Sequence, residues 1–138
     1  MKLVIDTNVL VSGLFWSGSP ARLMTMVNEG RAQHVWSSAL LQEFIVVVDR
    51  PKFTEPLRKM NCTVSDLVAE ISSQATMIVA SQVDPPPELR DPKDLIVLAA
   101  VVGSGADAIV TGDKDLLALG EFRGIPILDV AEALTRMS

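Results

Sequence analysis

Short apolar runs alternate with helix-patterned segments along the chain, and this alternation constrains its fold more than any other feature. Parallel strands joined through helices form a sheet that is covered on both faces by right-handed crossovers. The pattern therefore predicts a three-layer α/β/α fold around a central, mostly parallel sheet of about five strands. Strands are expected at residues 2–5, 33–36, 77–79, 108–110 and 125–128. Helices are expected at residues 9–15, 20–29, 38–49, 64–75, 92–102, 116–119 and 130–137.

Capping residues and prolines predict where several helices begin. Ser19 is expected to cap the second helix, with Pro20 at its first helical position. Ser37 or Ser38 is expected to cap the third helix. Residues 51–62 show neither the helical nor the strand periodicity of apolar side chains clearly, so we expect an irregular segment or a short helix there.

The length of 138 residues allows the chain to bury roughly two-thirds of its unfolded surface. No repeat or linker divides the chain, so we expect one domain over residues 1–138. Cys62 is the only cysteine and His34 the only histidine, which excludes a disulfide framework and a Cys/His zinc site. Because Asp6 interrupts the first apolar run, neither a signal peptide nor a membrane-spanning segment is expected. These features predict a cytoplasmic protein.

The charge of the chain is unevenly distributed. The formal net charge of −5 argues against a protein that holds nucleic acid by bulk electrostatics. Residues 20–60 carry six lysines and arginines against four acids, whereas residues 61–138 carry five against twelve. The concentration of acids in the second half therefore calls for a local explanation.

Two of the acids follow predicted strands. Asp6 comes directly after the first strand, and Asp113 comes shortly after the fourth. Ligands of parallel sheets bind beyond the carboxyl ends of the strands, where both side chains should meet. Either aspartate also suits the N-cap of the helix that follows it. The residues alone leave both roles open.

Three further acids lie near the starts or flanks of apolar helices. Glu43 lies on the flank of the helix at 38–49, where it faces either solvent or a site. Asp91 suits the N-cap position before Pro92. Asp94 starts from the buried side of the same helix, near its positive dipole end.

Carboxylates gathered in one place repel each other strongly. Two unit charges about 4 Å apart repel by roughly 4 kcal/mol at an effective dielectric constant near 20. A divalent cation reverses the sign of this energy. Ligands that are all oxygen, without histidine or cysteine, favour Mg²⁺ or Mn²⁺ over zinc or copper. The acids are therefore candidates for a metal centre that binds phosphate oxygens and orients an attacking water.

Four segments carry a specific resemblance to a known family. They are Val4-Ile5-Asp6-Thr7-Asn8-Val9, the serine-rich strand end that leads to Glu43, Asp91-Pro92-Lys93-Asp94, and Val110-Thr111-Gly112-Asp113-Lys114-Asp115-Leu116-Leu117. Together and in this order, they resemble the PIN-domain ribonucleases, which include toxins of toxin-antitoxin modules. The resemblance covers almost the whole chain. It implies a PIN-like α/β/α fold and a metal-dependent endoribonuclease that hydrolyses RNA phosphodiester bonds.

The resemblance also implies roles for individual residues. It places Asp6, Glu43, Asp94 and Asp113 in the catalytic centre, with Asp6, Asp94 and Asp113 as ligands of Mg²⁺ or Mn²⁺. Accessory positions that orient these groups would be Thr7, Asn8, Asp91, Thr111 and Asp115. Many relatives continue with alanines or another acid after the aspartate at position 94, whereas Leu95 follows here. The choice between Asp91 and Asp94 as the ligand therefore stays open.

Other phosphate-handling folds match the sequence less well. A haloacid-dehalogenase-type phosphatase needs a second aspartate two residues after the first, where this chain has Asn8. A receiver domain needs an acidic pair near the first strand and further residues, of which this chain has no clear version. A topoisomerase-primase domain needs an early glutamate, whereas the first strand here ends in Asp6. The remaining alternative is a catalytically silent PIN-like scaffold that binds RNA or protein, although no expected acid is replaced.

Cations are candidates to hold the RNA substrate, with Arg22, Arg50 and Lys52 in the basic half and Lys93 or Lys114 reaching phosphates next to the scissile one. The helix at 38–49 carries more apolar side chains than one core-facing stripe can bury, so part of it is expected to be a protein interface. We expect a homodimer built on this helix or on the first two helices. The resemblance adds an antitoxin protein as a further partner.

Overall fold

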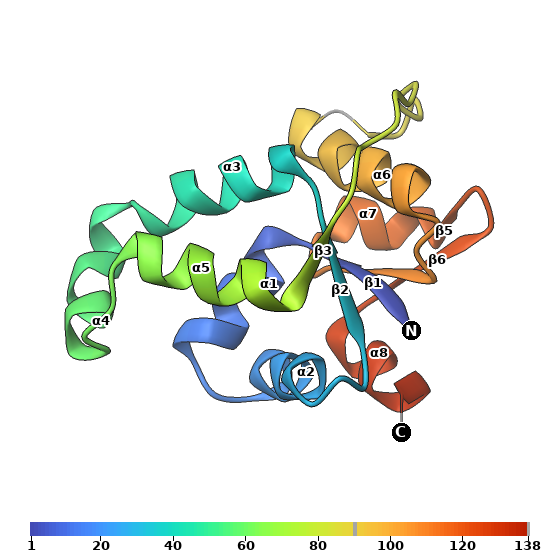
Figure 1. Ribbon diagram of the computed structural model, residues 1–138. Helices are drawn as coiled ribbons and strands as arrows, with labels where there is room; N and C mark the ends of the chain where they lie inside the picture. Colours follow the sequence, from blue (N-terminus) through green and yellow to red (C-terminus); the bar gives the residue numbers. More distant parts are fainter. Residues whose placement is uncertain (90, 138) are drawn as a thin grey trace.

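The computed structural model describes residues 1–89 and 91–137, which form a sheet covered by helices on both faces (Figure 1). The strand order is β3-β2-β1-β4-β6-β5. All neighbouring strands are parallel except β5, which pairs antiparallel with β6. The strands are β1 (Lys2–Ile5), β2 (Gln33–Trp36), β3 (Ala75–Met77), β4 (Ala108–Val110), β5 (Glu121–Phe122) and β6 (Ile125–Leu128). The predicted fold class is confirmed.

The helices lie in two layers and in an arm beyond the β3 edge of the sheet. Figure 1 shows α6 and α7 on one side of the sheet and α2 and α8 on the other, while α3, α4 and α5 extend outward. The helices before the arm are α1 (Thr7–Phe15) and α2 (Ser19–Asn28). The arm contains α3 (Ser38–Val48), the 3-10 turn η1 (Pro51–Phe53), α4 (Thr54–Lys59) and α5 (Val64–Gln74). The remaining helices are α6 (Pro92–Ser104), α7 (Lys114–Leu119) and α8 (Val130–Met137).

Burial explains why the central strands read as continuous apolar runs. In β1, Leu3, Val4 and Ile5 are at most 1% exposed, and the three residues of β4 are fully buried. Strands that are covered on both faces have no polar side to present to water. No helix within residues 1–89 and 91–137 has the length and apolar character needed to cross a membrane.

Three sequence predictions need correction. The third strand is β3 at Ala75–Met77, two residues before the predicted 77–79. The prediction relied on apolar residues, but β3 is an exposed edge strand, and the apolar Val79, which lies after it, is 88% exposed. A further strand, β5, was not predicted, because its two residues are too few to show the alternation of apolar and polar side chains that marks a strand. A turn with positive φ at Arg123 and Gly124 joins it to β6.

Gly18, rather than Ser19, occupies the N-cap of α2. The cap predicted for the third helix is Ser37, which accepts a hydrogen bond from the Leu40 N–H.

The chain segment that follows β3 packs tightly against α6 at Gly103. A Cβ added to Gly103 would overlap the carbonyl oxygen of Val79 and lie 2.9 Å from the Cα of Ala80. The backbone N–H of Ser81 donates to the carbonyl oxygen of Ala99, 3.1 Å away, and ties the same segment to α6. The glycine is therefore required by the close approach of a neighbouring backbone.

We expect Gly103→Ala to lower the free energy of unfolding by about 1–3 kcal/mol, although alanine has the higher helix propensity. The cause is overpacking against backbone atoms, which cannot rotate away. Urea unfolding checks this, with Ser104→Ala on the same helix as a control that should change stability by about 0.5 kcal/mol or less. A Gly103→Ala protein as stable as the wild type would contradict the packing argument.

Candidate metal centre

The parallel pairing of β1 with β4 brings the first two candidate acids together. Ile5 lies opposite Val110 in this pairing, and the Asp6 N–H donates to the Val110 carbonyl, 2.9 Å away. Asp6, the first residue after β1, therefore lies next to the end of β4, from which the chain continues to Asp113. Both lie at the carboxyl edge of the sheet, where a site was predicted.

Thr111 connects these two aspartates. Its hydroxyl donates to Oδ2 of Asp6 at 2.6 Å, and its oxygen accepts from the backbone N–H of Asp113 at 3.0 Å. Thr111 is fully buried, so this geometry is shielded from water. The threonine orients one carboxylate and holds the backbone of the other, and its role as an accessory residue of a catalytic site stays a prediction.

The first turn of α6 supplies two more aspartates in different environments. Asp91 is exposed, and its Oδ1 accepts from the Lys93 N–H at 3.0 Å, so it caps the helix. Asp94 is 5% exposed, and its Oδ2 has no hydrogen-bond partner among the described residues. A buried carboxylate oxygen without a partner is costly unless a cation binds it.

Asp94, Asp113 and Asp115 form a group that we call the acidic cluster. Each offers a carboxylate oxygen, and the three oxygens lie within 4.8 Å of one another. Asp115 was predicted only as an accessory acid, and its two-residue spacing from Asp113 was the available signal. Asp113 also caps α7, because its Oδ1 accepts from the N–H groups of Asp115 and Leu116. Asp6 lies beside this cluster but is not one of its three members.

Glu43 reaches the site from α3. The Thr7 hydroxyl, at the start of α1, donates to Oε2 of Glu43 at 3.0 Å. Thr7 is 2% exposed and Glu43 is half-buried, so the glutamate does not lie on a freely solvated flank. Asn8, another predicted accessory residue, is exposed and makes no hydrogen bond through its side chain within the described part of the chain.

The environment raises the pKa of Asp94 to about 6. Burial is the largest cause, followed by the negative charges of Asp113, Asp91, Asp6 and Asp115. No described lysine or arginine forms an ion pair with these carboxylates. Without a cation, the site therefore disfavours the ionised form of Asp94 compared with an ordinary aspartate.

Burial also raises the pKa of Asp6 and that of Glu43. The hydrogen bond from Thr111 opposes the shift at Asp6, and the charge of Asp113 adds to it. The hydrogen bond from Thr7 opposes the shift at Glu43, and Asp6 adds to it. The charge of Lys93 also lowers the pKa of Glu43, but no described lysine or arginine forms an ion pair with either acid. Crowded and buried acids of this kind fit a divalent cation, which would stabilise their ionised forms.

The predicted RNA-binding cations have different positions relative to these acids. Arg50 and Lys93 line the same groove as Glu43, beside the site. Lys52 places its ammonium 5.2 Å from the centre of the Phe53 ring, in the arm. Arg22 and Lys114 are exposed on α2 and α7.

The raised pKa of Asp94 predicts a pH-dependent stability in metal-free protein. The carboxyl binds its proton more tightly in the folded state, with a pKa of about 6 against the ordinary aspartate value of 3.8, so the contribution of Asp94 to wild-type stability falls as pH rises from 4 through 6. We expect Asp94→Asn to exceed the wild type by up to about 3 kcal/mol above pH 7 and to match it below pH 4.

Urea unfolding in EDTA at several pH values measures this difference. Asp84→Asn, an exposed change outside the acidic cluster, should show no such pH-dependent gain. A gain for Asp94→Asn that is absent at neutral pH, or equal at pH 4 and pH 7, would show that Asp94 is not an electrostatically strained group.

Comparison with known proteins identifies the family of the chain and a similar fold. A sequence profile described as the PIN domain matches residues 2–115. No curated protein is significantly similar to the chain in sequence. Among solved structures, the fold resembles that of VapBC2 from Rickettsia felis, bound to a DNA fragment from their promoter. The TM-score is 0.58 at 14% identity, and the match covers 94% of this chain and 98% of that chain. The chain belongs to the PIN-domain family.

Proposed function

We propose that this protein is a metal-dependent endoribonuclease and the toxin of a toxin-antitoxin pair. The observation that carries the proposal is the convergence of acids from separate segments around Asp94, whose buried Oδ2 has no partner among the described residues. Membership of the PIN-domain family and the structural likeness to VapBC2 support the same reaction class. A cytoplasmic location stays a prediction from the sequence.

The proposed metal is Mg²⁺ or Mn²⁺, because every candidate ligand is a carboxylate oxygen. Asp94 and Asp113 would hold it, with Asp6 completing the shell and Asp115 available as a further ligand. Asp94 is a better candidate than Asp91, whose carboxylate already caps α6. When bound, such a cation polarises a phosphodiester group and neutralises charge that develops during hydrolysis.

The protein's own side chains would position the reactants. Glu43, with its pKa raised by burial, is suited to hold the attacking water and accept its proton. Thr7 fixes one oxygen of Glu43 through the hydrogen bond at 3.0 Å, which leaves the other oxygen for the water. Thr111 fixes Asp6 in the same way.

Arg50 and Lys93 are the best-placed candidates for RNA contacts, because they share a groove with Glu43. Arg22, Lys52 and Lys114 remain candidates for more distant phosphates. Neutralising a cation that contacts a phosphate should make the dependence of log affinity on log salt shallower by about one unit of slope.

We expect Asp6→Asn to reduce cleavage of single-stranded RNA by about a hundredfold or more, because several kcal/mol of charge stabilisation would be lost. The swap is nearly isosteric and relieves repulsion, so the fold should persist. The assay uses purified protein with Mg²⁺ or Mn²⁺, and EDTA should abolish the wild-type activity. Asp129→Asn, the same swap at the start of α8, should cleave like the wild type.

Undiminished cleavage by Asp6→Asn would refute the assigned site. The alternative function, a silent scaffold, makes a different prediction. A metal at a hundred times its dissociation constant should stabilise the fold by about 2.7 kcal/mol whether or not RNA is cleaved. Stabilisation by Mg²⁺ or Mn²⁺ without any cleavage of RNA would favour the scaffold.

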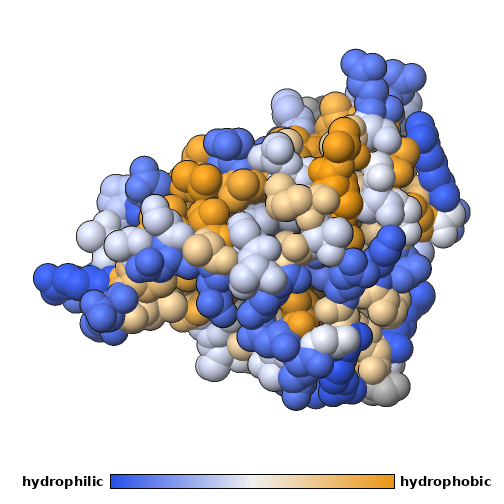
Figure 2. All heavy atoms as spheres, in the orientation of Figure 1, coloured by the Kyte–Doolittle hydropathy of each residue, from blue (hydrophilic) through white to orange (hydrophobic). Residues whose placement is uncertain are grey.

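We further propose that the protein forms a homodimer through α3. Val46 on this helix is 63% exposed. Figure 2 shows apolar surface over α3 and near α6. An exposed apolar patch of this kind is typical of a protein interface. The sequence predicted a dimer interface either on the helix at 38–49 or on the first two helices, and the exposed Val46 lies on the former, α3.

We expect the wild type to sediment as a dimer of the 14.9 kDa chain at micromolar concentration, and Val46→Glu to sediment as the monomer. A charge buried without a partner should weaken the interface by several kcal/mol. Val79→Glu introduces the same charge at a more exposed valine and should remain dimeric. A wild type that is monomeric at every concentration would contradict the proposal.

We also propose an antitoxin as a protein partner, supported by the structural likeness to VapBC2. An arginine or lysine of such a partner would find Asp6 and Asp113 without basic partners in the described chain. A bidentate arginine pair with either carboxylate would compete directly with the metal.

A further inference from the structure

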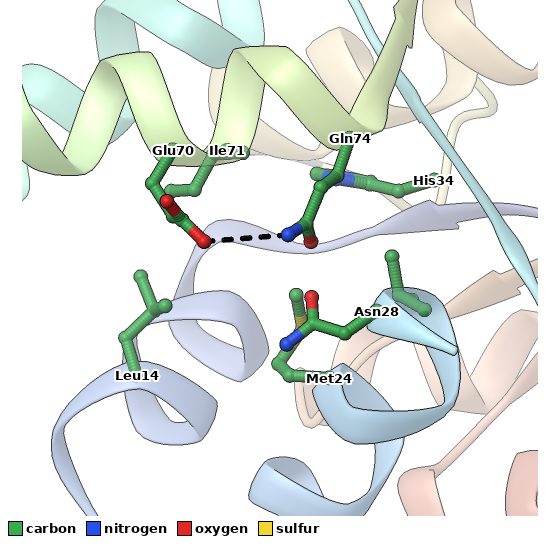
Figure 3. Close-up of a pocket in the computed structure, with 8 residues that line it drawn as sticks. Leu14, Met24, Asn28, His34, Glu70, Ile71 and Gln74 are labelled. Atoms are coloured by element: carbon green, nitrogen blue, oxygen red, sulfur yellow. Dashed lines mark hydrogen bonds between the residues drawn. The ribbon is translucent and has the colours of Figure 1, made fainter. Parts of the chain in front are cut away.

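Hollows lie on two sides of α1, and they differ in what can fill them. The first, between α1, α2 and α5, is drawn in Figure 3. Its lining includes the polar side chains of Asn28, Glu70 and Gln74, so water is a sufficient occupant. The second lies where the end of α1 meets α4 in the arm, and its volume is about 410 Å³. It is lined by Phe15, Glu55, Pro56, Lys59 and Met60.

An exposed tryptophan lies beside the second hollow. Trp16 follows Phe15 at the C-cap of α1 and is 56% exposed. The centre of its ring lies 6.1 Å from that of Phe15 and 6.2 Å from that of the buried Phe53, at interplanar angles of 58° and 63°. Neither contact is a parallel stack. An indole that two rings hold in place, and that is still more than half exposed, can stack on a further flat ring with little loss of entropy.

The segment that packs against Trp16 is strongly basic. Residues 50–60, which we call the basic segment, hold four of the twelve lysines and arginines of the chain but one of its seventeen acids. Arg58 pairs with Glu55 at 2.9 Å, whereas Lys52 and Lys59 form no ion pair within the described part of the chain. Lys52 lies over the buried ring against which the indole packs, and Lys59 lines the hollow. Two unpaired cations therefore flank the exposed indole.

We propose that Trp16, Lys52 and Lys59 form a platform for single-stranded RNA, with one base stacked on the indole and the adjacent phosphates held by the two lysines. Sites for single strands combine cations that follow the backbone with aromatic side chains that stack on bases. Stacking does not depend on net charge, so it suits a chain whose formal charge is −5. The inference rests on the proposed function, which supplies RNA as the substrate.

A second copy of the chain would fit this surface less well than RNA. In a symmetric dimer, the same patch lies on both sides of the interface. The basic segment of one protomer would then face the basic segment of its partner, and the like charges would repel. A phosphate backbone has the complementary charge.

The platform lies within reach of the acidic residues along α1. Thr7, which donates to Glu43, begins this helix of nine residues, and Trp16 follows its last residue. A rise of 1.5 Å per residue separates Thr7 from Trp16 by roughly 14 Å. A stacked strand advances about 3.4 Å per nucleotide, so a base on Trp16 would lie about four nucleotides from a phosphate at Glu43.

Trp16 can report its own contact with a base, because the second tryptophan, Trp36, is buried. The probe is octauridylate, added to the wild type in EDTA so that no metal-dependent cleavage takes place. Tryptophan fluorescence should fall in a saturable way as a base stacks on the indole. An octamer of the same sugar-phosphate chain without bases should leave the fluorescence unchanged.

Variants separate stacking from charge, with affinity measured by the anisotropy of labelled octauridylate. Trp16→Ala should weaken binding at least about fivefold, and Trp16→Phe, which keeps an aromatic ring, should stay within about threefold of the wild type. Trp16→Ala should leave the salt dependence unchanged, whereas Lys52→Ala should make it shallower by about one unit of slope. Val79→Ala alters an exposed apolar side chain elsewhere and should bind like the wild type.

Several outcomes would overturn the platform. They are the absence of saturable quenching, equal quenching by the octamer without bases, and Trp16→Ala protein that binds as tightly as the wild type. Fluorescence that changes with protein concentration in the absence of RNA would assign Trp16 to a protein contact instead. RNA cleavage with Mg²⁺ but without quenching would remove the platform and leave the nuclease intact, whereas quenching without cleavage would support the platform and count against the nuclease.

Discussion

The parallel pairing of β1 with β4 is the constraint on which the rest of the site depends. It places Ile5 opposite Val110, so Asp6 and Thr111 leave the sheet side by side and the hydroxyl of Thr111 reaches Asp6 at 2.6 Å. Both strands are buried on both faces, which holds the register firmly. A slip of one residue would turn Asp6 toward the core and would break the connection to Asp113.

Around this pairing, the protein keeps carboxylates in an environment that opposes their charge. Burial and mutual repulsion raise the pKa of Asp94 to about 6, while hydrogen bonds from Thr111 and Thr7 hold Asp6 and Glu43 in place. The folded chain therefore tolerates unfavourable electrostatics at one edge of its sheet, which the apolar core must offset. Such local strain is expected where a site is arranged for a ligand rather than for stability.

Much of the architecture could be predicted because it depends on local pattern. The buried runs of β1, β2, β4 and β6 were located at their observed bounds, since apolar continuity marks strands covered on both faces. The edge strands were located less well. The predicted third strand lies two residues after β3, which is largely exposed, and β5 was missed because it has two residues, joined to β6 by the turn at Arg123 and Gly124. An edge strand depends on its neighbour for hydrogen bonds more than on its own composition.

The sequence by itself determined the set of acids, their order and their places at strand or helix ends. Those features follow from residue type and local periodicity. Only the tertiary structure decided that Asp91 caps α6 while Asp94 is buried without a partner among the described residues, and that Asp115 joins Asp94 and Asp113. The positions 91 and 94 lie in one helical turn, where both carry the same chemistry. What separates them is which side of α6 packs on the sheet, and this depends on contacts between segments far apart in the chain.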